Sequence, residues 1–177
     1  VLLSAALPLG AKEPRALPAE LAAYVLTPAP EPTGLQLRKG ERLAICGDSI
    51  TEQKQYSQII ETYLTACLPE LEITCRQFGW SGEQASGFLA RMENDALRFE
   101  PTLATTCYGM NDFRYVPFND EFSSQYRKNL EALGAAFRER GCRVILGSPG
   151  IIDSVPHWVK HATGTQQDLN IALSKYR

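Results

Sequence analysis

Three short blocks of small and polar residues in this sequence carry the groups needed for acyl transfer. They are Gly47-Asp48-Ser49-Ile50-Thr51, Gly79-Trp80-Ser81-Gly82-Glu83 and Gly109-Met110-Asn111-Asp112. In the first block, Ser49 lies at a predicted strand-to-helix turn, where its hydroxyl is exposed near free backbone N–H groups. This position suits a serine nucleophile, but a helix N-cap formed by Ser49 or Thr51 explains the same residues.

The second and third blocks can supply hydrogen-bond donors to a developing oxyanion. Glycine at position 82 lets a backbone N–H approach a substrate oxygen closely, and the Asn111 side-chain amide can donate to the same atom. Each block also has an ordinary explanation, as a turn around Ser81-Gly82 or as a turn or cap at Asn111-Asp112. The spacing is 33 residues from Ser49 to Gly82 and 29 residues from Gly82 to Asn111. Each interval is long enough for one strand and one helix.

The segments around these blocks alternate between strand and helix. Apolar runs predict buried strands at 42–46, 71–78, 102–107 and 142–146. Apolar residues three and four apart predict helices over 56–67, from Phe88 to Ala96 and over 122–137, and Thr165 with Asp168 predicts a capped last helix. The alternation indicates a parallel sheet with helices on both faces. Because ligands in such sheets bind at the carboxyl ends of the strands, we expect the three blocks to converge there.

Together, Gly-Asp-Ser-Ile-Thr, Trp-Ser-Gly-Glu and Gly-Met-Asn-Asp resemble the SGNH hydrolase superfamily, also called GDSL lipases and esterases, over about residues 40–150. The resemblance implies a three-layer α/β/α flavodoxin-like fold with five central parallel strands. It implies that Ser49 is the nucleophile of an ester hydrolase that forms an acyl-enzyme. It also implies an oxyanion hole made by the Ser49 N–H, the Gly82 N–H and the Asn111 side-chain amide, while Asp48 holds the turn.

The general base of this superfamily is a histidine in an Asp-x-x-His block, and no such block occurs in the sequence. The two histidines, His157 and His161, follow the fourth predicted strand, and Asp153 precedes His157 by four residues. We expect both histidines to face solvent or the substrate rim, although Asp153 and His157 can in principle act as a displaced acid–base pair. We expect instead that the chain is an inactive fragment, with a fifth strand and the Asp-x-x-His block beyond Arg177.

Two functions stay open at this point. The first is a serine esterase for small acyl esters, with acetyl groups on carbohydrate as the expected substrate class and a lipid or lysophospholipid ester as the competing one. The second is a non-catalytic module that binds an acyl or glycan ligand without a general base. Trp80, Arg114 and Trp158 lie in loops at the catalytic edge, as does Tyr115. The first three are candidate substrate-binding residues, by stacking on a sugar or contacting an acidic group. Packing within the loops is the alternative for each of them.

Composition and charge narrow the classes of function. The 177 residues are 44% apolar and 21% charged, which is typical of one globular domain with a core. The formal net charge is −2 and no basic stripe occurs, so we do not expect nucleic acid as a partner. No apolar run is long enough to span a membrane. The histidines have no cysteine or carboxylate cluster beside them, and the sequence predicts neither a metal site nor a cofactor.

The first 40 residues differ in character from the rest of the chain. Residues 1–13 begin with a small, apolar stretch and predict the remnant of a secretory signal peptide, hence export to the periplasm or the extracellular space. An apolar arm lying on the domain is the alternative. Residues 14–40 contain five prolines and predict a linker. The esterase-type domain is predicted over 41–177, incomplete at its C-terminus.

Overall fold

The computed structural model describes residues 37–176. The predicted signal-peptide remnant (1–13) and most of the predicted linker (14–40) lie outside the described residues, and export therefore stays a prediction. The last part of the linker lies against the domain. The Gly40 N–H donates to the Leu71 carbonyl at 2.7 Å, and Leu37 packs beside the core of the sheet.

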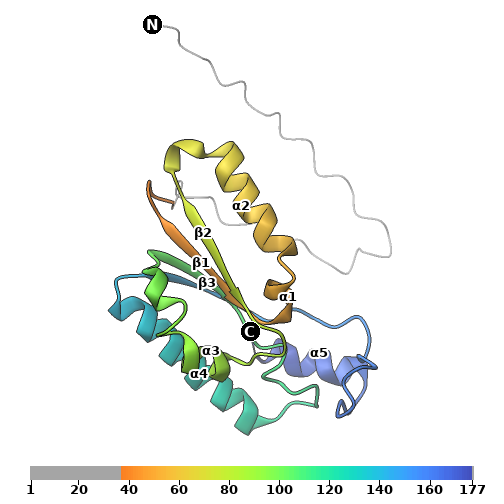
Figure 1. The fold of residues 1–177 in the computed structure, drawn as a ribbon. Coiled ribbons are helices and arrows are strands. Elements are labelled where there is room, and N and C mark those ends of the chain that lie inside the picture. Colours follow the sequence, from red (N-terminus) through yellow and green to blue (C-terminus); the bar gives the residue numbers. More distant parts are fainter. Residues whose placement is uncertain (1–36, 177) are drawn as a thin grey trace, which may run out of the picture. The chain divides into compact units, whose positions relative to one another are not determined.

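A four-stranded parallel sheet forms the centre of the described residues (Figure 1). Its strands are β1 (Arg42–Gly47), β2 (Thr74–Gly79), β3 (Leu103–Cys107) and β4 (Arg143–Gly147), in the order β2-β1-β3-β4. Gly47 pairs with both Gly79 and Cys107, and Cys107 pairs with Gly147, so the strands end level at one edge. The predicted parallel sheet is confirmed, while the fifth strand expected beyond Arg177 stays a prediction.

Helices cover both faces of this sheet, which confirms the predicted α/β/α arrangement. They are α1 (Ser49–Glu52), α2 (Gln55–Cys67), α3 (Ala85–Arg91), α4 (Asp120–Glu139) and α5 (Gln166–Ser174), with short 3-10 turns at Pro69–Leu71 and Leu97–Phe99. Helix α2 lies on one face, and helices α3 and α4 lie on the other (Figure 1). Between residues 37 and 176, no helix combines the length and the apolar character required to cross a membrane.

Alternate residues of β1 build the two halves of the core. Leu43 and Ile45 are buried on the α2 side, where they cluster with Leu64. Ala44 belongs to the larger cluster on the other face, together with Phe88 of α3. Because successive side chains of a strand point to opposite faces, a central strand between two helical layers must be apolar throughout. Burial on both faces holds β1 in the centre of the sheet. The position of β1 in turn determines where the Gly47–Thr51 block, which follows it directly, is placed.

One predicted strand boundary is wrong for a local reason. The second strand, expected from residue 71, begins at Thr74. Residues Pro69–Leu71 form a 3-10 turn instead, and Glu72 ends this turn with a left-handed backbone φ of 51°. The alternating pattern of apolar residues extends through the turn, and pattern alone could not separate the two.

One of two predicted helix boundaries is confirmed, and the other is wrong. The capped last helix is confirmed, because Thr165 and Asp168 form both hydrogen bonds of a capping box at the start of α5. The helix expected from Phe88 to Ala96 is shorter than predicted, since α3 ends at Arg91. Ala96 is fully buried all the same, in the turn that follows. A buried turn can therefore imitate the apolar spacing of a helix.

Candidate active site

The turn after β1 presents the Ser49 hydroxyl. Asp48 is the N-cap of α1, and its carboxylate accepts from the Ile50 N–H at 3.0 Å. The interpretation of Ser49 or Thr51 as the cap is therefore wrong, and the Thr51 hydroxyl instead lies 2.6 Å from the hydroxyl of Tyr56. Within residues 37–176, the Ser49 hydroxyl has no hydrogen-bond partner. It is thus free to face a ligand.

A close approach between α1 and the end of β2 holds this turn in place. A Cβ atom on Gly79 would lie 2.3 Å from the Glu52 backbone nitrogen, a distance that real Cβ atoms do not reach. Glycine at this position therefore lets α1 pack directly on the strand end. The Gln77 side chain also donates to the Thr51 carbonyl. The first turn of α1, which carries Ser49, is thus anchored to the neighbouring strand.

Gly82 requires glycine because of its backbone conformation. Its φ is +72°, in the left-handed region that residues with a Cβ rarely adopt. A Cβ at this position would meet no neighbouring atom within 4 Å, so space is not the constraint. The glycine conformation turns the loop after β2 so that Gly82 lines the same cleft as Ser49.

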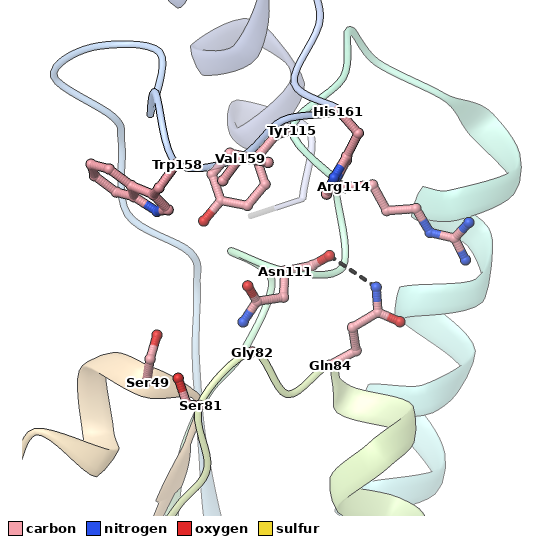
Figure 2. Close-up of a pocket in the computed structure, with 10 residues that line it drawn as sticks. All are labelled: Ser49, Ser81, Gly82, Gln84, Asn111, Arg114, Tyr115, Trp158, Val159 and His161. Carbon is pink, nitrogen blue, oxygen red and sulfur yellow. Dashed lines mark hydrogen bonds between the residues drawn. The ribbon is translucent and has the colours of Figure 1, made fainter.

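The Asn111 side chain is held across the cleft by the loop after β2. Its Nδ2 donates to the Glu83 carbonyl at 3.0 Å and lies 3.4 Å from a carboxylate oxygen of Asp48. Figure 2 shows the amide nitrogen on the side of Ser49. One amide hydrogen is therefore held by the Glu83 carbonyl, and the other makes a longer hydrogen bond to Asp48, beside Ser49. Asn111 also lies in a turn, as the alternative predicted, and its carbonyl accepts from the Arg114 N–H at 3.2 Å, whereas a role as a helix cap is not observed among residues 37–176.

Further hydrogen bonds join the loops that carry Gly82 and Asn111. The Gln84 side chain donates to the Asn111 carbonyl at 2.9 Å (Figure 2). The Asp112 carboxylate accepts from the backbone N–H groups of Ala85 and Gly109, each at 3.0 Å. Burial raises the pKa of Asp112 to about 6, although both N–H groups oppose this shift. These bonds give the two loops one fixed geometry.

A partly buried ion pair between Arg91 and Glu83 holds the loop that carries Gly82 against the end of β2. Arg91 donates to both carboxylate oxygens of Glu83, at 2.6 and 2.7 Å, and to the Phe78 carbonyl at 2.9 Å. The Tyr108 hydroxyl donates to the same Glu83 carboxylate at 3.1 Å. The hydrogen bonds with Glu83 raise the pKa of Arg91 further above its ordinary value. Sequence reasoning missed this pair, because eight residues separate Glu83 from Arg91 and no helical spacing marks it.

Ser49, Gly82 and Asn111 line a single cleft of about 490 Å³ at the carboxyl edge of the sheet. Figure 2 shows Ser49, Ser81 and Gly82 on one side of this cleft, and Trp158, Val159 and Tyr115 across from them. A second cavity of about 460 Å³ also contains Ser49 and Asn111. Its further lining residues come from the turn after β1 and from the loop after β4, and include Asp48, Ile50, Gln53, Ile152, Asp153 and Pro156.

The three predicted substrate-binding residues have different positions. Trp158 lines both cavities, and 72% of its surface is exposed. Arg114 lines the first cavity, but its guanidinium lies 4.1 Å above the Phe122 ring and points away from Ser49 (Figure 2). Trp80 lines neither cavity, and its ring lies 5.4 Å from the Arg91 guanidinium. A substrate contact by Trp80 stays a prediction.

The histidines do not form the displaced acid–base pair. His157 packs against Trp158, with 5.0 Å between the ring centres, and lines neither cavity. Asp153 lines the second cavity, and no hydrogen bond or ion pair links it to His157 in the described part of the chain. His161 lines the first cavity, on the wall across from Ser49 (Figure 2). Residues 37–176 contain no cluster of three side chains suited to bind a metal ion.

Comparison with known proteins agrees with this geometry. The profile of the GDSL-like lipase/acylhydrolase family matches residues 45–176. None of the curated proteins matches the chain. Among solved structures, the chain is similar to Axe2, an acetylxylan esterase from Geobacillus stearothermophilus, at 25% sequence identity and a TM-score of 0.65. The match covers 80% of this chain and 70% of Axe2.

Two further solved structures share the fold at lower identity. LAE5, an alpha/beta hydrolase enzyme from the metagenome of Lake Arreo, Spain, is 22% identical, with 81% of this chain and 72% of LAE5 covered and a TM-score of 0.64. BT4096, a gut microbial diltiazem-metabolizing enzyme, is 23% identical, with 79% of this chain and 33% of BT4096 covered and a TM-score of 0.64. Because the family profile covers most of the chain and contains Ser49, Gly82 and Asn111, the chain belongs to the GDSL-like lipase/acylhydrolase family, the SGNH hydrolases.

Proposed function

We propose that this protein is a serine ester hydrolase that acts on small acyl esters through an acyl-enzyme on Ser49. The observation that carries the proposal is the presence of Ser49, Gly82 and Asn111 on one cleft, with the serine hydroxyl unpaired. The family and the likeness to an esterase support the same reaction class. The substrate that we propose is an acetyl ester of a carbohydrate.

In this reaction, the Ser49 oxygen attacks the ester carbonyl and gives its proton to a general base. The carbonyl oxygen becomes an oxyanion, which the backbone N–H groups of Ser49 and Gly82 and the Asn111 amide stabilise. The base then passes the proton to the leaving alcohol, and the bond between the carbonyl carbon and that alcohol breaks. Water next attacks the acyl-enzyme, and the acid and the free serine are released.

The proposal takes the general base from an Asp-x-x-His segment that the 177 residues do not contain. Catalytic mutants of Axe2 replace a serine, an aspartate or a histidine, and its aspartate precedes the histidine by three positions. In this chain, Gly82 lines only the first cavity, whereas Ser49 lines both. The second cavity therefore offers a base access to Ser49 from the side away from the Gly82 N–H.

The carbohydrate part of the proposal rests on the residues that line the cleft and on one relative. The exposed ring of Trp158 offers a surface on which a sugar can stack. Ser81 and Gln84 add polar groups to the first cavity. Axe2, which is an acetylxylan esterase, is similar at 25% identity. A small acyl group and a sugar alcohol together match this polar cleft.

Hydrolysis of a chromogenic acetate ester, with imidazole added as the missing base, tests the proposal. The protein-dependent rate should rise with imidazole and disappear in Ser49→Ala. Ser86→Ala provides a matched control, because Ser86 is exposed on α3 and lines neither cavity. Acetate esters should react faster than esters of long fatty acids. A Ser49→Ala variant that keeps the full rate contradicts the proposal, and glycan binding without Ser49-dependent hydrolysis favours the non-catalytic module.

A further inference from the structure

Two consecutive residues at the cleft have a strained backbone. Arg114 and Tyr115 both adopt left-handed conformations, with φ of 57° and 56°. Each such residue with a Cβ costs roughly 1–2 kcal/mol. The other three non-glycine residues with positive φ among residues 37–176 are single and stand at helix or turn ends: Lys54, Glu72 and Glu100. Arg114 and Tyr115 are instead the two central residues of a turn, which the Val116 N–H closes on the Phe113 carbonyl at 3.4 Å.

This turn places the side chain of Tyr115 between the two cavities. Tyr115 lines both of them, as do Ser49, Asn111 and Trp158. Its ring packs against Phe113, with 4.8 Å between the ring centres. Figure 2 shows the hydroxyl turned into the cleft, across the open space from Ser49 and beside Trp158. The turn thus delivers an aromatic side chain to the site.

A hydrogen bond from the loop after β4 keeps this residue in position. The Thr163 N–H donates to the Tyr115 carbonyl at 3.0 Å. The same loop carries Trp158, so the two aromatic residues that line both cavities belong to linked segments. A fixed ring with few rotatable bonds loses little entropy when a ligand binds. The Tyr115 side chain is therefore pre-organised to contact a ligand in the cleft.

The hydroxyl of Tyr115 is left available for a ligand. It has no hydrogen-bond partner among the described residues, whereas the hydroxyls of Tyr56, Tyr108 and Tyr126 are all hydrogen-bonded within the fold. Burial raises the pKa of Tyr115, and the nearby Asp48 carboxylate raises it further. The phenol is therefore protonated at neutral pH and can act as a donor.

We propose that the Tyr115 hydroxyl donates a hydrogen bond to the carbohydrate part of the ester while that sugar stacks on Trp158. This inference rests on the proposed function, because it assigns the sugar to the cleft that contains Ser49. A sugar offers many hydroxyl oxygens as acceptors and a flat apolar face for an aromatic ring. Tyr115 is thus a substrate-binding residue that selects for the alcohol part of the ester.

The test measures binding of acetylated xylotetraose by calorimetry, in a Ser49→Ala background that prevents turnover. Loss of one neutral hydrogen bond should raise Kd about 2- to 10-fold in Tyr115→Phe. The matched control is Tyr63→Phe, because Tyr63 lies on α2, is 58% exposed and lines neither cavity. Its Kd should equal that of the background protein. The thermal unfolding midpoint should be unchanged in both variants.

Each outcome has a separate meaning. A higher Kd in Tyr115→Phe alone supports the assignment. Equal Kd values in Tyr115→Phe and in the background protein overturn the role of the hydroxyl, and the proposed esterase is unaffected. A background protein that does not bind acetylated xylotetraose overturns the carbohydrate assignment. Hydrolysis of the simple acetate ester, which depends on Ser49 and not on a sugar, then shows separately whether the proposed function fails.

Discussion

The orientation of the Asn111 amide is set by a carbonyl, and this decides what Asn111 can do. Because the Glu83 carbonyl accepts a hydrogen bond from Nδ2 at 3.0 Å, a flipped amide would place two oxygens against each other. The nitrogen therefore faces the Glu83 carbonyl and the Asp48 carboxylate. In the proposed reaction, the amide exchanges its long hydrogen bond to Asp48 for one to the oxyanion, while the Glu83 carbonyl keeps the amide in place.

We expect Asn111→Ala to lower kcat on an acetate ester by roughly 10²- to 10³-fold with little change in KM. The reason is that the donor acts on the oxyanion and only weakly on the ground-state carbonyl. Steady-state kinetics with added imidazole measure both constants. Asn94→Ala is the control, because Asn94 is exposed after α3 and lines neither of the two cavities. A raised KM at constant kcat in Asn111→Ala would indicate ground-state binding instead.

At the scale of elements, one arginine holds several segments around the site. Arg91 at the end of α3 donates to the Phe78 carbonyl of β2 and to Glu83 in the loop between them. Glu83 also accepts from Tyr108, which follows β3. Because the Glu83 side chain is only 7% exposed, its charge would be costly without this partner. Arg91 therefore stabilises the packing of α3 and, through Glu83, the position of Asn111.

Replacing this arginine should destabilise the whole domain. We expect Arg91→Met to lower the free energy of unfolding by about 2–4 kcal/mol, since it leaves a buried carboxylate unpaired. The control is Arg140→Met, which removes an ion pair with Glu93 whose side chains are 55% and 65% exposed. That change should cost less than about 1 kcal/mol. Urea unfolding measures both values, and equal losses would show that burial of the Glu83 pair has no special effect.

At the scale of the whole molecule, buried carboxyls should make stability depend on pH. Burial raises the pKa of Asp112 from 3.8 to about 6, and it also raises the pKa of Asp48. A raised pKa in the folded state means that folding favours the protonated form. The contribution of Asp112 to the free energy of unfolding is therefore fully present below pH 3.8 and is lost as the pH rises through about 6.

The variant Asp112→Asn cannot titrate at this position. From about pH 4 to pH 7, the free energy of unfolding should decline less in this variant than in the unmodified protein. The difference between the two declines should reach up to about 3 kcal/mol. Urea unfolding at several pH values provides the comparison. Asp153→Asn, at an exposed position, should follow the unmodified protein. Parallel curves for Asp112→Asn and the unmodified protein would contradict the raised pKa.

The sequence predicted the sheet and the meeting of the three blocks because these depend on local patterns. Apolar runs mark the strands, and Gly47, Gly79 and Gly109 mark where they end or have just ended. The contacts that hold the loops of the site in place could not be predicted in the same way. The hydrogen bonds of Glu83 with Tyr108 and of Tyr115 with Thr163 arise only when distant segments pack together. The sequence also leaves the cap of α1 ambiguous, because Asp48, Ser49 and Thr51 can each accept from a backbone N–H.

The central claim is that Ser49 is the nucleophile, and covalent labelling tests it most directly. The protein is incubated with a fluorophosphonate and added imidazole, and the adduct is located by peptide mass spectrometry. The account predicts one adduct per chain, on Ser49, and no adduct in Ser49→Ala. Absence of any adduct, or an adduct that persists in Ser49→Ala, would contradict it.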